Sequence, residues 1–293
     1  MALFLSVLEQ GLIYAVLALG VYITFRILDF PDMSVDASFP LGAAVTAMMI
    51  EKGASPLLTL PAAMAAGALA GALTGFIHVK FKVRDLLSGI IVMTGLYSVN
   101  LHIAGRANVQ LFAHATIFKN PTFNALPFSV QTYVPVIILA VITIVVKLLL
   151  DAYLSTRSGF LLRATGDNPS LVATLAKDSG KVKILGLSIA NALVALSGCI
   201  MCQYQRYFDI SMGTGTLVLA VASVIVGSQL LRGLRFLSAT TAVVLGSILY
   251  KGCVALALSM GLSPFDLKLV TAALLLIIII AGGHDRKKVK HRA

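Results

Sequence analysis

The chain has 293 residues, of which 58% are apolar and only 12% are charged, and its mean hydropathy is +0.95. A soluble domain carries about a quarter charged residues, so these values exclude an ordinary soluble protein. In a soluble chain the net charge of +11 would suggest a nucleic-acid partner, but here Lys and Arg gather in short loops and in the C-terminal tail. Membrane topology and lipid headgroups explain such basic loops better, and we expect no nucleic-acid partner.

Apolar runs near the length that crosses about 30 Å of hydrocarbon as a helix recur along the chain. The first run follows Met1 closely without a basic n-region or a cleavage site, which predicts a retained helix. The sequence therefore predicts an all-α polytopic membrane protein with one transmembrane domain. The nine predicted spans lie near 7–27, 37–50, 56–79, 86–104, 132–150, 184–204, 215–231, 238–258 and 265–281.

Basic residues set the predicted orientation, because cytoplasmic loops are enriched in Lys and Arg. The tail at 282–293, the central loop at 155–183 and the stretch Lys80–Arg84 are therefore expected inside, and the loop at 105–131 outside. Counting back through nine spans places the N-terminus outside and the acidic loop 26–36 inside. That acidity conflicts with the rule unless the loop is buried or re-entrant.

Two polar segments indicate an internal repeat, since Asp32–Ser38 matches Asp209–Gly215 in residue type. Each segment follows one apolar run and precedes three others. The arrangement predicts two inverted four-helix repeats, 7–104 and 184–281, joined by a linking helix at 132–150.

Both matched segments are rich in Pro, Gly or acids, and we expect them to be discontinuous helices. Non-helical backbone at membrane depth is tolerated only where protein or a water-filled cavity surrounds it, and such breaks lie beside transport paths. The alternative is a pair of surface loops, and Asn191 could equally bond a neighbouring helix. The candidate path residues are Asp32, Ser34, Asp36, Asn191, Asp209 and Ser211.

Two further patterns lie inside apolar runs. Gly67, Gly71 and Gly75 recur at intervals of four, which predicts a close helix-packing face. Cys199 and Cys202 form a C-x-x-C with no other Cys or His near in sequence. We interpret them as small apolar residues on one helix face in preference to a redox or metal site.

The longest polar segment between two apolar runs is Ser155–Lys183. It predicts a short helix at 159–165, a turn at 166–169, and a second short helix capped by Asp167 or Asn168. Its pattern T-x-x-G-x-x-x-R-A-x-G-D-N-P comprises Thr156, Gly159, Arg163, Ala164, Gly166, Asp167, Asn168 and Pro169.

This pattern resembles the cytoplasmic coupling loop of ABC importer permeases, in the family that serves branched-chain amino acids, ribose and nucleosides. The resemblance implies that the loop, together with Arg157, docks in a groove of an ATPase subunit. The alternative is an ordinary basic cytoplasmic loop. A second pattern, D-x-S-V-D-x-S-F-x-L-G-A at Asp32–Ala43, resembles a branch of that family whose operons carry a separate binding protein, thought to take aromatic amino acids.

The resemblance implies a non-catalytic, multi-pass permease subunit of the bacterial plasma membrane, without cofactor or metal. It implies a small solute, an aromatic or branched-chain amino acid. The implied partners are an ATPase, a solute-binding protein that docks near the 105–131 loop, and a second permease copy or paralogue. The chain contains no G-x-x-x-x-G-K-[ST], so ATP hydrolysis would belong to the partner.

Alternative functions also follow from the residues. A sugar or nucleoside importer would share the same coupling loop. An ion-coupled secondary transporter would use acids such as Asp32, Asp36 and Asp209 as ion sites. An intramembrane enzyme lacks support, because the sequence contains no H-E-x-x-H, and no G-x-S-x-G lies on a predicted span.

Overall fold

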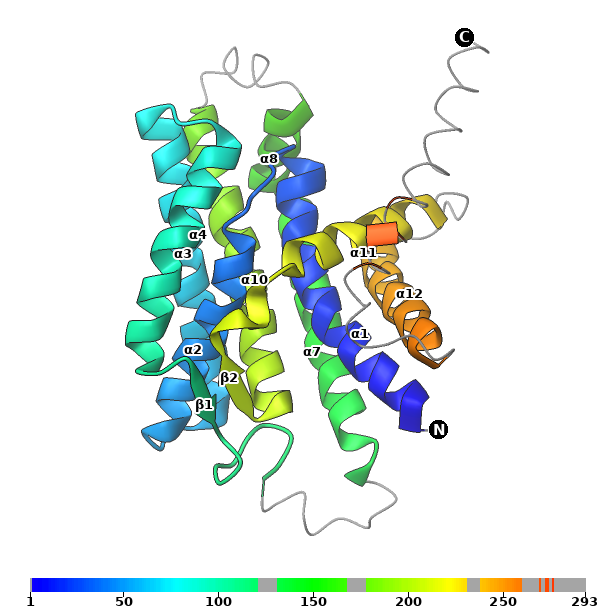
Figure 1. Ribbon diagram of the computed structural model, residues 1–293. Helices are drawn as coiled ribbons and strands as arrows, with labels where there is room; N and C mark the ends of the chain where they lie inside the picture. Colours follow the sequence, from blue (N-terminus) through cyan, green and yellow to red (C-terminus); the bar gives the residue numbers. More distant parts are fainter. Residues whose placement is uncertain are drawn as a thin grey trace.

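The structure is a computed structural model that describes residues 2–120, 131–167, 178–230 and 238–259, together with 269, 272, 273 and 276. Most of its long helices run along one common axis, and α11 lies across them (Figure 1). The helices of the first half are α1 (Ala2–Val21), its π-helical extension η1 (Tyr22–Ile27), α2 (Val35–Glu51), the 3-10 turn η2 (Pro56–Leu58), α3 (Thr59–Phe81) and α4 (Asp85–Ala104).

The rest of the described chain contains five α-helices and two short strands. They are β1 (Asn108–Gln110), α7 (Val134–Leu154), α8 (Arg157–Asp167), α10 (Ser179–Gln205), β2 (Tyr207–Asp209), the 3-10 turn η3 (Ile210–Gly213), α11 (Thr216–Leu230) and α12 (Ala239–Ser259).

Seven helical segments in the described part of the chain are long and apolar enough to cross a membrane. The predicted spans at 7–27, 56–79, 86–104, 132–150, 184–204, 215–231 and 238–258 correspond to these seven. The eighth, 37–50, is present as α2, which has 17 residues and starts inside the bundle. Most of the predicted span 265–281 and the tail 282–293 lie outside the described residues. The all-α, multi-pass prediction is confirmed, and nine remains an approximate count.

The centre of the bundle is formed by α1 and α10. Along α10 almost every residue from Gly186 to Gln203 is buried, as expected of a helix that is apolar all round. The glycine face of α3 packs directly on α10: a Cβ at Gly67 would lie 2.3 Å from the carbonyl oxygen of Asn191, and one at Gly71 would lie 2.1 Å from that of Leu187. The predicted close-packing face is confirmed.

The two cysteines of the C-x-x-C pattern lie on α10 as free, buried thiols. The Sγ of Cys199 is 3.3 Å from the Oγ1 of Thr59, at the start of α3. Both cysteines therefore pack among helices as small core residues, as the sequence interpretation predicted.

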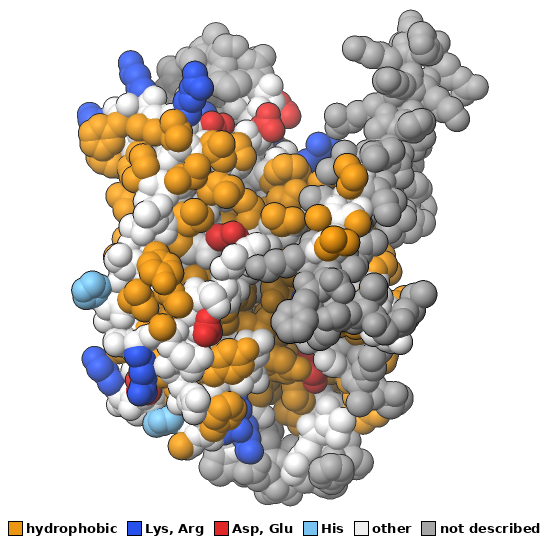
Figure 2. All heavy atoms as spheres, in the orientation of Figure 1, with side chains coloured by type: hydrophobic (Ala, Val, Ile, Leu, Met, Phe, Trp, Pro, Cys, Tyr) orange, Lys and Arg blue, Asp and Glu red, His pale blue; other side chains and the backbone are white. Residues whose placement is uncertain are grey.

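The linking helix α7 has one face in the core and one outside. Leu139, Thr143, Val146 and Leu150 are buried at helical spacing, whereas Ile137 and Leu149 are 57% and 65% exposed. Figure 2 shows the same distribution over one side of the molecule, with hydrophobic side chains across its middle and Lys and Arg mainly towards its ends. Such a surface matches a hydrocarbon layer bounded by water on both sides.

Candidate functional site

The first helix break begins where α1 ends in the π-helical turn η1. The backbone of Asp29 is left-handed (φ 51°), and the chain then turns back into the bundle, where Phe30 is 3% exposed. The acidic loop 26–36 is therefore largely buried, which removes the conflict with the charge rule. Its predicted non-helical extent, Asp32–Ser38, is too long, because only Asp32–Ser34 is non-helical and α2 starts at Val35.

The side chain of Asp32 stabilises the start of α2 at Val35. Its Oδ1 accepts hydrogen bonds from the Ser34 backbone N–H at 2.9 Å and from the Ser34 hydroxyl at 2.6 Å. This local turn satisfies the backbone N–H of Ser34, the N-cap residue of α2. Gly89 of α4 packs on the turn so closely that a Cβ there would lie 2.7 Å from the backbone nitrogen of Met33.

Asn191 joins this turn to the central helix α10. Its Nδ2 donates to Asp32 Oδ2 at 2.8 Å and to the Leu187 carbonyl at 3.1 Å, and its Oδ1 lies 3.3 Å from the Ser34 hydroxyl oxygen. Asp32, Ser34 and Asn191 are each at most 1% exposed. Three predicted path residues, separated by almost 160 positions in sequence, thus form one buried network. The buried carboxyl group of Asp32 is tolerated because it accepts three hydrogen bonds.

The second break, between α10 and α11, meets the first one. Asp36 of α2 accepts hydrogen bonds from the Gly215 and Leu217 backbone N–H groups, at 3.1 and 2.8 Å, and from the Thr216 hydroxyl at 3.0 Å. A carboxylate is a strong N-cap, and it is favoured by the positive end of the helix dipole. Here the cap of α11 comes from the other half of the chain. Gly213 also packs on α2, since a Cβ there would lie 2.0 Å from the Asp36 carbonyl oxygen.

The remaining two predicted residues lie at the start of this second break. Asp209 Oδ1 accepts from the Ser211 backbone N–H at 2.8 Å and from its hydroxyl, and Oδ2 accepts from Asn108 Nδ2 at 3.2 Å. The hydrogen bond from the Ser211 hydroxyl holds the pKa of Asp209 below its ordinary value. Strands β1 and β2 pair antiparallel here, with Asn108 opposite Asp209. The loop that follows α4 is thereby fastened to the loop that follows α10.

The two breaks differ in exposure. The Asp32 network is closed, although Asp32 borders an apolar cleft of about 210 Å³ between residues 24–32 and the start of α11. At the second break Ser211, Thr214 and Gly215 are exposed. Figure 2 shows acidic side chains among hydrophobic ones in the middle of the visible face. Exposed polar groups at the level of the hydrocarbon layer face a water-filled path or another protein.

The sequence reasoning missed several polar residues. In the G-T-G-T run, Thr214 is exposed in the turn before α11, and Thr216 is the buried first residue of that helix. On α4 the exposed polar residues Thr94, Ser98 and His102 lie on one face. Their spacing of four was a signal that the sequence already contained.

Helix α8 lies at the opposite end of the bundle from the N-terminus (Figure 1). It packs inward through Gly166, where a Cβ would lie 1.8 Å from the Ile27 carbonyl oxygen, and through Leu162, which contacts Gly186 at the start of α10. At Gly159 a Cβ would lie 2.5 Å from the Tyr153 carbonyl oxygen. Both glycines therefore serve contacts within the chain.

The predicted turn at 166–169 is wrong for its first two residues, because Gly166 and Asp167 end α8 as helical residues. Asn168, Pro169 and the predicted second helix lie outside the described residues. The loop is also shorter than predicted, since Lys181 and Lys183 already belong to α10. Residues 157, 160, 163 and 167 are exposed on one face of α8, and they are Arg157, Phe160, Arg163 and Asp167.

Several known proteins that are similar to this chain are membrane permeases. The family described as "Branched-chain amino acid transport system / permease component" matches residues 3–280. The chain belongs to this family. It is the membrane-spanning permease subunit of an ABC importer, which decides against the ion-coupled transporter. The permease is 41% identical over 278 residues to the tyrosine transport system permease protein of Clostridioides difficile (strain R20291), covering 95% of this chain and 90% of that protein.

More distant proteins share the architecture. The permease is 26% identical to the ribose import permease protein RbsC of Escherichia coli (strain K12), over 78% of this chain and 70% of that one. Among solved structures, it is similar to PsaBC from Streptococcus pneumoniae in complex with Fab, with a TM-score of 0.51 and 14% identity over 95% of this chain and 89% of that chain. At that identity the likeness concerns the fold alone.

Proposed function

We propose that the permease imports an amino acid of the tyrosine type, with energy from an ATPase subunit that docks on α8 and the residues after it. The observation that carries this proposal is the two-sided character of α8. Its inner face is fixed to η1 and α10 by close contacts at Gly166 and Leu162. Its outer face presents Arg157, Phe160 and Arg163, a cationic and aromatic surface of the kind that forms protein interfaces.

The contacts of α8 also suggest how ATPase motion reaches the transport path. Gly166 lies against Ile27, the last residue of η1. The chain then leads through Phe30 to the Asp32 network, and from Asp36 of α2 to the start of α11. A shift of α8 would therefore bear on both helix breaks, because closely packed backbones transmit displacement and do not absorb it.

The solute path in this proposal lies between two permease copies, along the exposed polar surface of the second break. Ser211 and Asp209 would line its outer part, and Asp36 its middle. The buried Asp32, Ser34 and Asn191 would border the path only in another conformation. The paired strands at the outer end, with the residues up to 131, would receive a solute-binding protein. In this orientation α8 and the C-terminus face the cytoplasm of a bacterial cell.

The docking of α8 is tested by Arg163→Glu. Reversal of a charge at a desolvated contact costs on the order of several kcal/mol, so ATPase copurification and uptake should both be lost. Membrane insertion should not change, because Arg163 is exposed. Lys52→Glu is the matched control, since Lys52 is exposed at the C-terminal end of α2 and does not belong to α8. A complete ATPase complement with normal uptake in Arg163→Glu would refute the docking proposal.

The solute is tested separately. Cells that express the permease with the ATPase and binding protein of its own operon are given labelled tyrosine, leucine or ribose. The similarity to a tyrosine permease supports uptake of tyrosine. Uptake of ribose alone would instead favour the sugar importer, for which the weaker similarity to a ribose permease is the specific support.

A further inference from the structure

A depression of about 610 Å³ lies where α3 ends and where α4 and α10 begin. Its lining comes from three span ends, since the candidate spans end at Phe81 and begin at Asp85 and Ser179. The depression therefore lies at the level of the boundary between hydrocarbon and water, where lipid headgroups are found. The residues that line it are His78, Val79, Lys82, Val83, Arg84, Asp85, Asp178, Ser179, Gly180 and Lys183.

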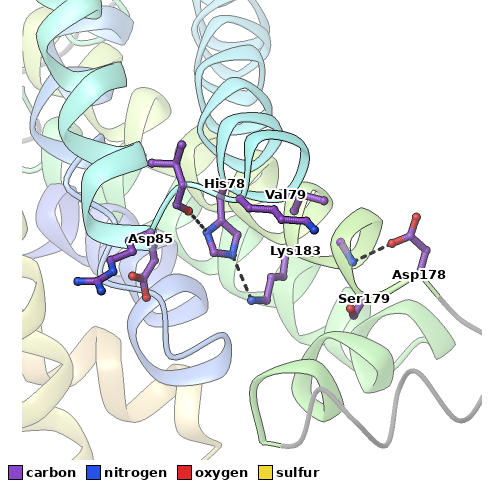
Figure 3. A pocket seen from close by; sticks show the side chains of 10 residues that line it. His78, Val79, Asp85, Asp178, Ser179 and Lys183 are labelled. Atoms are coloured by element: carbon purple, nitrogen blue, oxygen red, sulfur yellow. Dashed lines mark hydrogen bonds between the residues drawn. The ribbon is translucent and has the colours of Figure 1, made fainter.

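One histidine orients a cation in this depression. In Figure 3 a dashed line joins the imidazole of His78 to Lys183, and the other ring nitrogen bonds the Val83 carbonyl. Its Nδ1 is 2.9 Å from the Val83 oxygen, and its Nε2 is 3.3 Å from Lys183 Nζ. An ammonium group only donates, so Nε2 accepts and Nδ1 carries the proton that binds Val83. The ring also packs edge-on against Phe30, with centroids 5.1 Å apart. Lys183 is thus held in place with two further N–H groups available.

The balance of charge in the depression is positive. Its two carboxylates are already used by helix starts: Asp85 accepts from the Leu86 backbone N–H, and Asp178 accepts from those of Gly180 and Lys181. Asp178 also lies 3.9 Å from the ammonium group of Lys181. Among the described residues, none of the three lining cations, Lys82, Arg84 and Lys183, takes part in an ion pair. The positive dipole ends of α4 and α10 add to this field, and the negative end of α3 offsets about one of them.

Apolar side chains continue from the depression towards the hydrocarbon. Phe81 is 66% exposed, and Leu86 and Leu87 on the first turn of α4 are 44% and 50% exposed. A free phosphate ion would gain nothing from them, and a protein acid would need a partner that reaches the membrane surface. A lipid brings both an anionic head and acyl chains. Basic pockets between membrane helices are known to bind such headgroups.

We propose that this depression binds the phosphate headgroup of an anionic phospholipid, with Lys183, Arg84 and Lys82 as its donors and His78 as a positioning residue. Phe81, Leu86 and Leu87 lie against the acyl chains. The proposal requires only that the chain lies in a membrane, and it does not depend on where the ATPase docks. The lipid would fix the ends of α3, α4 and α10 relative to one another, next to the turn that carries Asp32.

The test measures phosphatidylglycerol and phosphatidylcholine binding to the full chain in detergent by native mass spectrometry. Each basic group near a membrane surface changes affinity by about fivefold, so Arg84→Gln with Lys183→Gln should weaken phosphatidylglycerol binding roughly 10- to 30-fold. Phosphatidylcholine binding should not change. The matched control is Lys52→Gln with Lys119→Gln, which removes two exposed cations outside the depression and should leave both affinities within about twofold.

Further measurements distinguish a phospholipid in the depression from a free anion or a protein. Lys82→Gln alone should weaken phosphatidylglycerol binding about fivefold, which keeps the proposal testable if the double variant is unstable. His78→Gln retains an acceptor for Lys183 and should bind phosphatidylglycerol more tightly than His78→Leu. Displacement of phosphatidylglycerol by millimolar inorganic phosphate would overturn the proposal in favour of a free anion. Loss of ATPase copurification in the double variant, with unchanged lipid affinity, would also overturn the proposal. That result would mean that the depression binds a protein.

Discussion

The two helix breaks occupy matching places in the two halves of the chain but are stabilised in different ways. The first, at Asp32–Ser34, is buried and is held by side chains of the break itself and of α10. The second, at Asp209–Gly215, is largely exposed, and its helix start is held by Asp36 from the other half. The comparison suggests that the first break is an anchor, and that the second is the part of the path that can rearrange.

The largest expected effect is on the anchor. Asn191→Leu removes the α10 donor to a buried carboxyl group, and leaving a buried acceptor without its hydrogen bond costs about 1–3 kcal/mol or more. We expect a large fall in melting temperature and in folded yield. Ser188→Ala is the control, because Ser188 is on the same helix and, among the described residues, its side chain bonds only the Ile184 carbonyl. Thermal unfolding in detergent decides the matter: equal melting temperatures for the two variants would contradict an anchoring network.

The second-largest expected effect is at Gly213, where the two helix breaks touch. Gly213→Ala would place a methyl group 2.0 Å from the Asp36 carbonyl oxygen and 2.6 Å from Pro40 Cδ. Overpacking of this kind costs about 1–3 kcal/mol, and α11 should move away from α2. Gly95→Ala provides the comparison, because within the described part of the chain its added Cβ would face open space. Melting temperature and uptake should fall for the first variant only, and loss of both in Gly95→Ala would refute the packing argument.

Much of this arrangement was predictable from the sequence. Apolar run length gave the spans, and the match between Asp32–Ser38 and Asp209–Gly215 located both breaks. The intervals of Gly67, Gly71 and Gly75 predicted a packing face, though not its partner α10. The contacts between distant segments could not be predicted, because hydrogen bonds such as that from Asn191 to Asp32 join residues 159 positions apart. For the same reason Gly166 was expected to form a turn, whereas the Ile27 carbonyl against it requires a glycine within a helix.

Removal of the cap between the halves should have a smaller effect. Asp36→Ala deletes the acceptor for Gly215, Thr216 and Leu217, and loss of an N-cap costs about 0.5–2 kcal/mol. Asp209→Ala removes a comparable cap from the short turn η3, where Ser211 is exposed, and should cost less. Asp36→Ala should reduce uptake by more than its fall in melting temperature accounts for. If Asp209→Ala is the more damaging variant in both measurements, Asp36 does not join the two breaks.

A pair of glycine variants that should lose equal stability best separates the anchor from the moving part. Gly215 and Gly53 both have left-handed backbones, with φ of 84° and 80°, and within the described chain a Cβ built on either would meet open space. Alanine at each should therefore cost the same strain, about 1–2 kcal/mol. Gly53 lies in the turn after α2, whereas Gly215 is the last residue before α11. If the second break rearranges during transport, Gly215→Ala should slow uptake while Gly53→Ala, with an equal fall in melting temperature, should not. Equal uptake by the two variants would mean that the second break is as static as the first.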